Sequence, residues 1–530
     1  MVPRMQDVEA KAYERRWWIL GVLCLSLFII VLDNSILNVA LPTIVRELDA
    51  TNSQLQWMVD AYTLVFAGLL LTGGALGDRF GRRGALQVGF VIFGLGSVLS
   101  ALASTPNQLI ATRAFMGIGG AFIMPATLSI ITNVFPPRER GRAIGMWAGV
   151  AGLAILGPLV GGFLVEHFYW GSIFWVNIPI VVFGLVAGVF LIPTSKDPAA
   201  RPLDPVGAVL SIAGLTVLIY GIIEAPGQGW TGGRTLVAFA IGAVLIALFF
   251  AWEARTEYPM LDLGFFKNPR FTAASSAVAF IFFAMFGSIF LFTQYFQFVL
   301  GYSALGTGVR LMPWAVTMMI VAPNSPRLVE RVGTKVVVSS GLALMGVGLI
   351  TMAGVSASSP YPDIVWRMVL MAAGMGLTMA PATESIMGSL PLAKAGVGSA
   401  VNDTTRQVGG ALGVAVIGSV ASSLYASHVA DAVPAGTPPG VTDQVKEQIG
   451  AALAIAERFD IPELATAARS AFVDGMHAGV LVAAGAALLG ALFTALWLPA
   501  RAPDAPEGGT GDPDADRPGA DPVEPAPARS

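Results

Sequence analysis

A series of long apolar runs constrains this chain more than any other feature of its sequence. A helix that crosses a bilayer needs about 20 mainly apolar residues, and we find fourteen runs near that length. They lie at 17–41, 55–76, 85–103, 108–131, 143–165, 173–193, 206–225, 235–252, 272–299, 305–324, 336–355, 364–388, 398–425 and 476–498. Charged residues make up only 12% of the chain, about half the share in soluble proteins. We therefore predict an all-α polytopic membrane protein with 14 transmembrane helices.

Basic residues set the expected orientation of these spans. Lys and Arg gather in the first tail and in the loops that lead from an even-numbered to an odd-numbered span. The opposite short loops hold only Arg46 and Arg234. Because loops rich in Lys and Arg stay in the cytoplasm, we expect both termini to be cytoplasmic.

Short motifs repeat at about half the length of the chain. An acid-Arg-x-Gly-x-basic order at Asp78–Arg83 returns at Glu330–Lys335, and Pro125-Ala126-Thr127 returns at Pro381-Ala382-Thr383. Internal repeats of this kind are typical of transporters. Spans 1–6 would then match spans 9–14, which predicts a 6 + 2 + 6 architecture.

This repeat suggests a division of the chain into five parts. They are a cytoplasmic tail (1–16), an N-terminal six-helix bundle (17–193), two inserted helices with flanking loops (194–271), a C-terminal six-helix bundle (272–498) and a disordered cytoplasmic tail (499–530). Within the second bundle, residues 426–475 are expected to form a long external loop with one short amphipathic helix, Thr442–Arg458. The last tail is rich in Pro, Asp, Glu, Gly and Ala, a composition that cannot build a core.

A charged island separates the second span from the third and is expected to form a tight loop on one membrane face. Its marked residues are Gly73, Gly77, Asp78, Arg79, Gly81, Arg82 and Arg83. The island resembles the gating loop between the second and third helices of the major facilitator superfamily. An ordinary positive cytoplasmic loop is the alternative interpretation.

Three of the acids within apolar runs are candidates for function, because an ionisable side chain there is expensive and usually functional. Asp33 belongs to Leu32–Pro42, which resembles the first-helix signature of the fourteen-helix drug:H⁺ antiporters, the EmrB/QacA-like family. Asp60 lies near the end of the second span, and Glu384 lies within the twelfth. These acids are candidates for proton coupling or substrate binding. Asp33 could instead be a structural partner for another helix, and Asp60 a solvated interfacial residue.

Arg113 begins the fourth span in a segment that resembles the family motif implicated in proton coupling. A guanidinium does not release its proton at working pH, but it can stabilise a nearby carboxylate and let it go on rearrangement. Snorkelling of Arg113 to the membrane interface is the alternative. In the thirteenth span, Asn402, Asp403 and Arg406 could face a cavity or form a solvated helix end.

The fifth span carries a stripe of small residues followed by a proline. It resembles the antiporter motif of the family, which is associated with exporters; its residues here are Gly149, Gly152, Gly157, Pro158, Gly161 and Gly162. Glycines let helices touch backbone to backbone, and a proline bends a helix. Generic tight packing would explain the same pattern.

The resemblance covers residues 17 to about 498 and implies a proton-coupled exporter of drugs or natural products that works by alternating access in the plasma (inner) membrane of a bacterium. Its expected partners are a small lipophilic or cationic substrate, protons and the lipid bilayer, and we expect a monomer that binds no nucleic acid. We expect no enzyme activity, cofactor or metal site; Cys24 is the single cysteine. An importer of a small nutrient and a non-transporting sensor or scaffold remain as alternatives.

Overall fold

The protein is described here from a computed structural model. It describes residues 13–136, 156–196, 204–259, 261–389, 395–434 and 437–499, together with Glu139, Ala143, Met146, Trp147 and Val150. The expected tails therefore lie almost wholly outside the described residues, as do Gly149 and Gly152 of the fifth span.

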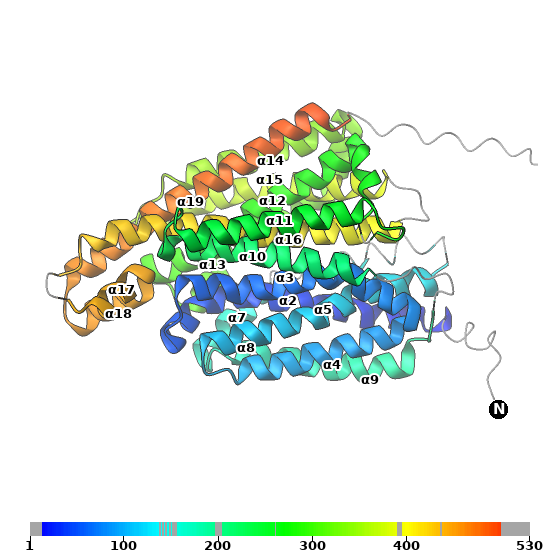
Figure 1. The fold of residues 1–530 in the computed structure, drawn as a ribbon, viewed down its shortest axis with the longest axis horizontal. Coiled ribbons are helices and arrows are strands. Elements are labelled where there is room, and N and C mark those ends of the chain that lie inside the picture. The colour runs from blue at the N-terminus through cyan, green and yellow to red at the C-terminus, as the bar shows by residue number, and fades with distance from the viewer. Residues whose placement is uncertain are drawn as a thin grey trace, which may run out of the picture.

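Helices make up the regular structure of the described residues (Figure 1). The long helices are α2 (Arg16–Leu48), α3 (Asn52–Phe80), α4 (Arg82–Ala101), α5 (Pro106–Val134), α7 (Leu156–His167), α9 (Asn177–Leu191), α10 (Pro205–Gln228), α11 (Gly233–Glu253), α12 (Pro269–Gln294), α13 (Ala304–Val332), α14 (Thr334–Met352), α15 (Tyr361–Met387), α16 (Ala395–Ala430) and α19 (Pro462–Trp497). The shorter ones are α8 (Ser172–Trp175), η2 (Leu263–Lys267), η3 (Tyr295–Val299), α17 (Pro439–Glu447) and α18 (Ile449–Arg458).

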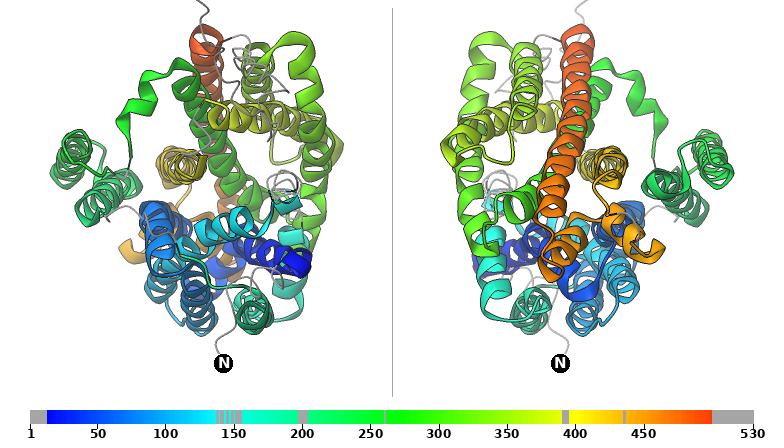
Figure 2. Two further views of the ribbon diagram at one scale, coloured as in Figure 1. Left: turned by 90° about the vertical axis from the view of Figure 1, so that its right-hand side faces the viewer. Right: turned by 90° about the vertical axis from the view of Figure 1, so that its left-hand side faces the viewer.

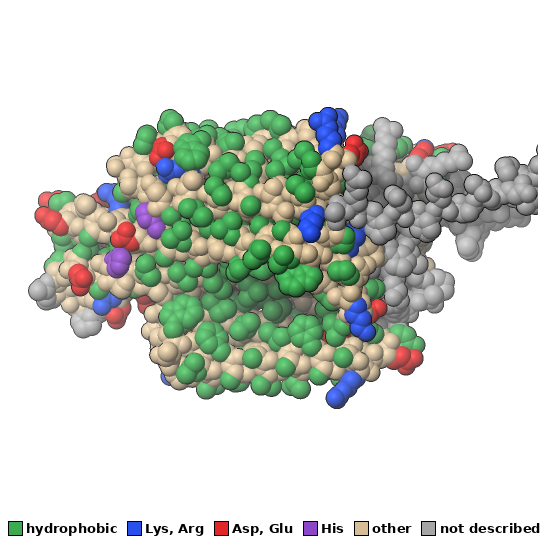
Figure 3. Space-filling view, turned by 90° about the horizontal axis from the view of Figure 1, so that it is seen from above, with side chains coloured by type: hydrophobic (Ala, Val, Ile, Leu, Met, Phe, Trp, Pro, Cys, Tyr) green, Lys and Arg blue, Asp and Glu red, His purple; other side chains and the backbone are tan. Residues whose placement is uncertain are grey.

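Twelve helices in the described part of the chain are long and apolar enough to cross a membrane. The expected count of fourteen is not confirmed. The two expected spans outside the twelve are 55–76, which lies in α3, and 143–165, of which only the end is seen as α7. The structure describes neither segment completely: the side chain of Leu71 and most of residues 143–155 lie outside the described set. The space-filling view shows the apolar band of such a protein, with charged side chains gathered toward its two ends (Figure 3).

The long helices form two groups, and one further pair of helices lies beside both of them (Figures 1 and 2). In the first group α3 and α4 pack on α5, and α2 packs on α7 and α9. In the second, α14 packs on α15 and α19, while α12 packs on α16. The pair α10–α11 stands at one side, where α10 contacts both α3 and α16. The inserted pair therefore spans the seam between the two groups.

Glycine contacts within the two groups show the internal repeat in three dimensions. A Cβ at Gly119 of α5 would lie 2.8 Å from the carbonyl oxygen of Gly89 in α4. In the second group, a Cβ at Gly374 of α15 would lie 2.5 Å from that of Gly341 in α14. Such backbone-to-backbone contact needs small residues. Gly341 follows Gly89 by 252 positions, the offset that also relates the two charged motifs.

The charged island between the second and third spans is helical almost throughout, so its prediction as a loop is wrong. α3 continues to Phe80 and α4 begins at Arg82, which leaves Gly81 as the single junction residue. Gly81 has φ +127°, a conformation that favours glycine. The same arrangement recurs where Gly333, with φ +85°, separates α13 from α14. One glycine is enough to reverse the chain, so both helices keep their terminal turns.

The contacts across the seam lie toward the end of the molecule that carries α17 and α18. Gly162 of α7 faces the backbone of Ala304 and Leu305 in α13, and Gln56 of α3 accepts a hydrogen bond from Ser419 of α16 at 3.3 Å. Toward the opposite end, where α2 begins and α19 ends, the two groups splay apart (Figure 1). The seam is therefore closed at the α17–α18 end in this conformation.

Residues 426–475 are far more helical than the loop we expected. α16 continues to Ala430 and α19 already begins at Pro462, because both helices extend beyond their apolar runs. The expected single helix Thr442–Arg458 is two helices, separated at Gln448, whose backbone is extended. Packing explains the break: Tyr425 of α16 donates a hydrogen bond to Val445 of α17 at 2.9 Å, whereas α18 packs on α19.

Candidate functional site

A buried ion pair joins two of the predicted residues inside the first group of helices. Asp33 of α2 and Arg113 of α5 have side chains that are 0% and 1% exposed, and Oδ2 of Asp33 accepts a hydrogen bond from Nη1 of Arg113. The other carboxylate oxygen, Oδ1, accepts one from Asn177 of α9 at 3.0 Å. Asn177 also contacts Ser97 of α4 at 3.1 Å. A single carboxylate thus connects α2, α5 and α9.

Arg113 is held on its other sides by α3. Its Nε donates to the carbonyl oxygen of Met58 at 3.2 Å, and its guanidinium lies 4.5 Å from the ring centre of Tyr62. The interpretation that Arg113 snorkels to the interface is wrong, since α5 begins at Pro106 and places this residue two turns inside the helix. The ring of Tyr62 and the carbonyl of Met58 are contacts that Arg113 can keep if Asp33 loses its charge.

Asp60 is fully buried, so the alternative of a solvated interfacial residue is wrong for it. Neither carboxylate oxygen has a hydrogen-bond partner among the described residues. Gln56 and Leu64, one turn away on either side, both face α16: Gln56 through Ser419, and Leu64 through a cluster with Ala411 and Ala415. Because residues four apart share a helix face, Asp60 lies on the face of α3 that meets the second group.

Glu384 is not a buried membrane acid, as its position in the apolar run had indicated. It is exposed and lies in the last turn of α15, which ends at Met387. Arg270, at the start of α12, lies within electrostatic reach of Glu384 and donates to Ser385 at 3.0 Å. The apolar run continued to the helix end here, so it gave no sign of how close Glu384 is to that end.

The polar residues that begin the thirteenth span form a cluster inside the second group. Arg406 lies 3.6 Å from Asp403 on the same helix, and it donates to Thr383 of α15 at 2.9 Å. Its guanidinium also approaches the ring of Phe282 in α12, at 5.5 Å. Asp403 is buried, so the interpretation of this segment as a solvated helix end is wrong.

The described glycines of the fifth span bring α7 against α2 and α13. A Cβ at Gly157 would lie 2.6 Å from Cβ of Ser35, and one at Gly161 would lie 2.5 Å from Cγ1 of Ile36. Both neighbours follow Asp33 closely on α2. From the other side, a Cβ at Gly308 of α13 would lie 2.2 Å from the carbonyl oxygen of Pro158. The motif therefore lies where α2 of the first group meets α13 of the second.

Two residues of the charged island contact the end of α9 and the segment that follows it. The backbone N–H of Arg82 donates to Ser195 at 3.1 Å, and the side chain of Arg83 donates to Ile192 at 3.3 Å. Cations are favoured at helix C-termini, where carbonyl groups lack partners. Gly73 touches α5 and Arg79 is exposed. The side chain of Asp78 lies outside the described residues.

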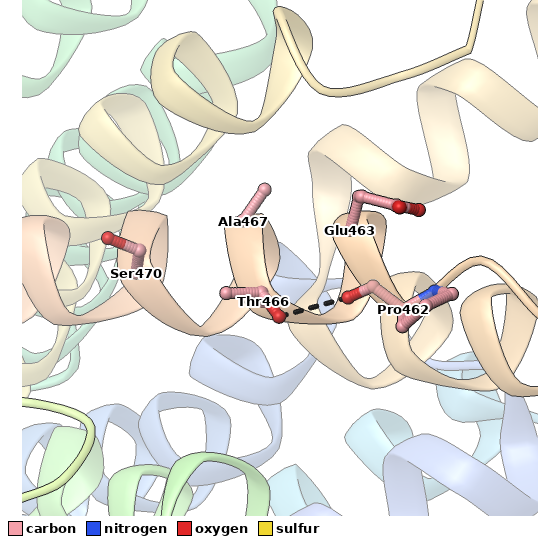
Figure 4. Close-up of a pocket in the computed structure, with 5 residues that line it drawn as sticks. All are labelled: Pro462, Glu463, Thr466, Ala467 and Ser470. Carbon is pink, nitrogen blue, oxygen red and sulfur yellow. Dashed lines mark hydrogen bonds between the residues drawn. The ribbon is translucent and has the colours of Figure 1, made fainter.

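A shallow pocket of about 440 Å³ lies on the first turns of α19 (Figure 4). Pro462, Glu463, Thr466, Ala467 and Ser470 line it, and Thr466 donates to the carbonyl oxygen of Pro462 at 3.0 Å. All five residues come from a single helix (Figure 4). This pocket contains none of the buried charged residues, so it is not the candidate site.

Two contributors to the site were missed from the sequence. Neither Asn177, in the expected sixth span, nor Tyr62, two residues after Asp60, was a candidate from the sequence. Both become informative through contact, since Asn177 bonds Asp33 and Tyr62 lies under Arg113. An asparagine inside an apolar run is itself a signal, because a polar side chain there needs a partner.

Comparison with known proteins decides the family. The sequence profile of the Major Facilitator Superfamily matches residues 23–414, which is most of the chain. The chain belongs to this superfamily. As a major facilitator protein it is a multi-pass membrane transporter and not an enzyme.

Curated relatives of this major facilitator protein are similar over nearly their whole length. The multidrug efflux pump LfrA of Mycolicibacterium smegmatis is 37% identical over 492 residues, which cover 90% of this chain and 96% of LfrA. The tetracenomycin C resistance and export protein of Streptomyces glaucescens is 31% identical, with coverage of 88% and 86%. The methyl viologen resistance protein SmvA of Salmonella typhimurium is 32% identical, with coverage of 91% and 98%.

Solved structures agree on the fold. A bacterial homolog of the human lysosomal transporter Spinster, in an inward-facing and unoccupied conformation, superimposes with a TM-score of 0.66. The match covers 92% of this chain and 99% of that one, at 18% sequence identity. The chain therefore has the all-α fold of major facilitator proteins.

Proposed function

We propose that this protein is a proton-coupled exporter of small lipophilic or cationic drugs or natural products, in the fourteen-helix drug:H⁺ antiporter branch of its superfamily. Relatives named for efflux or resistance match it along nearly their full length. The single observation that carries the proton coupling is the buried pair of Asp33 and Arg113.

The geometry suggests how a proton would act on this pair. A buried carboxylate is tolerated when it is paired and hydrogen-bonded, and Asp33 has both Arg113 and Asn177. A proton on Asp33 removes the attraction to Arg113, which then keeps its contacts with Met58 and Tyr62. α2 is thereby released from α5, and α2 is the helix on which the α7 glycines pack.

Asp60 is the second acid of the proposed coupling. Burial of an ionised carboxylate with no partner is very unfavourable, so the conformation seen here favours the neutral acid at Asp60. If the seam between α3 and α16 opens to the outside, the face that carries Asp60 becomes accessible, and the acid can take up a proton there and hold it while the seam is closed. Asp33 and Asp60 would then respond oppositely to the opening of the seam, because Asp33 has charged and polar partners in this conformation and Asp60 has none among the described residues.

Alternating access fits the position of the seam contacts. They lie at the α17–α18 end, which the distribution of basic residues predicts to be outside. The protein would therefore be seen open toward the cytoplasm, and the opposite state requires α3 to leave α16 and α7 to leave α13. We also propose that α3 and the segment around 143–165 complete fourteen spans in a 6 + 2 + 6 arrangement, with both termini in the cytoplasm of a bacterial cell and the protein working as a monomer.

Everted membrane vesicles provide the test. With the parent protein, an imposed proton gradient should drive uptake of a cationic dye such as ethidium, and an uncoupler should abolish it. Asp33→Asn should remove this uptake, whereas Arg458→Gln, a change at an exposed arginine outside the spans, should not. Loss of dye from the vesicles on energisation would favour an importer, and no gradient-dependent movement of dye would favour a sensor or scaffold.

A further inference from the structure

The second group of helices contains an arginine that corresponds to Arg113 but lacks a buried carboxylate partner. Arg367 lies near the start of α15, as Arg113 does in α5. Its Nη2 atom is 3.1 Å from Asp363 on the same helix, whose side chain is 37% exposed. The other two nitrogens, Nε and Nη1, are buried and have no hydrogen-bond partner among the described residues.

The reason lies in the helix that corresponds to α2. In the first group, α2 supplies Asp33 to Arg113. In the second group this place belongs to α12, and its sequence from Pro269 to Gln294 contains no Asp or Glu. A buried guanidinium N–H without an acceptor is costly. The second group therefore repeats the arginine without a carboxylate on the helix that corresponds to α2.

A second arginine adds charge beside this position. Arg310 of α13 stacks on the ring of Tyr302, with its guanidinium 3.7 Å from the ring centre, and Tyr361 of α15 donates to its carbonyl oxygen at 2.9 Å. Its Nε is also buried without a partner among the described residues. The guanidinium of Arg310 also lies 5.5 Å from the ring centre of Tyr361, which precedes Arg367 on α15, and Tyr295 lies within electrostatic reach of Arg367 and Tyr302.

We propose that Arg367 and Arg310 form a binding site for the phosphate group of an anionic ligand. A guanidinium donates its N–H groups to phosphate oxygens, and three nitrogens, Nε and Nη1 of Arg367 and Nε of Arg310, have no hydrogen-bond partner among the described residues. The ligand would occupy the place that a carboxylate like Asp33 fills in the first group. This proposal does not depend on proton-coupled export.

The phosphate can come from the headgroup of an anionic phospholipid or from free phosphate in solution. Arg367 lies close to the surface that faces the bilayer, because its neighbour in sequence, Trp366, is 47% exposed. Tryptophan is enriched at the level of lipid headgroups, and the side chain of Arg367 retains 12% exposure. Both sources share the same chemistry at the arginines, so the experiment must separate them.

Thermal unfolding of the purified full-length protein in detergent, titrated with defined probes, tests the site. The probes are short-chain phosphatidylglycerol, the matching diacylglycerol without phosphate, and inorganic phosphate alone. We expect phosphatidylglycerol to raise the Tm and diacylglycerol to leave it unchanged. A rise with inorganic phosphate alone would assign the same site to free phosphate, and a rise of equal size with diacylglycerol would overturn the proposal.

Three variants connect the effect to the arginines. Arg367→Gln should weaken phosphatidylglycerol binding by about ten- to a hundredfold, the usual effect of hydrogen bonds to a charged group. Arg458→Gln, at an exposed arginine of α18, should bind as the parent does. If Arg367→Gln does not fold, Arg367→Lys retains the charge and Arg310→Gln removes the second cation; the first should bind more tightly than the second. Binding that is unchanged in Arg367→Gln, or equal in Arg367→Lys, Arg310→Gln and the parent, would show that no such site exists.

Discussion

The carboxylate of Asp33 and the guanidinium of Arg113 are almost completely shielded from solvent, so each stabilises the other. Removal of one partner from a buried pair leaves an uncompensated charge and typically costs about 3–5 kcal/mol. Replacement of both partners by neutral groups is far less harmful. Single and double variants can therefore separate the contribution of the pair to stability from its proposed role in transport.

We therefore expect Asp33→Asn to lower the free energy of unfolding of the purified protein by about 3–5 kcal/mol. The double variant Asp33→Asn/Arg113→Gln should recover most of that loss and yet remain inactive in dye efflux. Unfolding in detergent and efflux from cells are the two measurements. A double variant that regains efflux together with stability would show that the pair has a structural role only.

Asp60 should behave in the opposite way. Its carboxyl group has no described partner to lose, and a neutral group of similar shape avoids the burial of a potential charge. Asp60→Asn should therefore unfold at the same temperature as the parent or higher, but should lose proton-driven efflux. Clear destabilisation without a transport defect would mean that Asp60 has a structural partner and no part in coupling.

The individual charges at this site could be found from the sequence, but their relations could not. Asp33 and Arg113 were conspicuous because they interrupt apolar runs. Their pairing depends on how α2, α5 and α9 cross, and 80 residues separate the two partners. The alternative of a solvated Asp60 could not be excluded for the same reason, since distance from a helix end says nothing about the neighbour that covers that face.

At the scale of elements, the contact between α7 and α2 allows no side chain at Gly157. Even a methyl group there would lie 2.6 Å from Cβ of Ser35 and 3.0 Å from the backbone nitrogen of Ile36. These atoms belong to a helix backbone or lie next to it, so they cannot move aside as the end of a long side chain would. The helix pair must separate instead.

Gly157→Ala should therefore already impair export, and Gly157→Leu should abolish it. Overpacking of this kind costs about 1–3 kcal/mol, comparable to the free-energy difference between two conformations of a transporter. Gly485→Ala in α19 is the control, because a Cβ there meets nothing within 4 Å. Efflux rates in everted vesicles compare the variants; equal rates for Gly157→Ala and Gly485→Ala would contradict the prediction.

Helix positions followed from the apolar runs, whereas helix ends did not. Hydropathy marks the part of a helix that lies in lipid, and helices such as α3, α16 and α19 continue beyond it. For this reason the charged island and much of residues 426–475 looked like loops. The break at Gln448 depends on which neighbours α17 and α18 pack against, and no local pattern encodes that choice.

On the scale of the whole molecule, the orientation in the membrane remains a prediction from the positive residues. Ser427, exposed near the end of α16, should lie outside the cell, and Lys196, exposed after α9, should lie inside. In a background without Cys24, Ser427→Cys should react with an impermeant maleimide in intact cells, and Lys196→Cys only in broken cells. The reverse pattern would invert the topology.

The closed seam provides a second test at this scale. Oε1 of Gln56 and Oγ of Ser419 are 3.3 Å apart across the two groups. In the same background, cysteines at both positions should form a disulfide that stops efflux, and a reductant should restore it. Single cysteines are the controls. Normal efflux by a fully cross-linked protein would show that α3 and α16 do not separate during transport.

The two-part architecture was the most predictable property of the molecule. Repeated motifs indicated two similar halves, and the structure shows matching glycine contacts and matching junctions at the same spacing. The relation between the halves could not be inferred, because the sequence contains no sign of which end of the seam is closed. The closed end of the seam is a property of one conformation, and the sequence is the same in every conformation.

The single-residue junction at Gly81 gives α3 the mechanics of a lever. α3 contains no proline, and its 25 residues from Gln56 to Phe80 span about 37 Å at the usual rise of an α-helix. A tilt of only about ten degrees around Gly81 would swing Gln56 through about 6 Å, twice the length of a hydrogen bond. A movement too small to disturb the junction would thus break the contact with Ser419 at the far end. α13, which leads into the matching junction at Gly333, carries Pro313, Pro323 and Pro326 and lacks this rigidity.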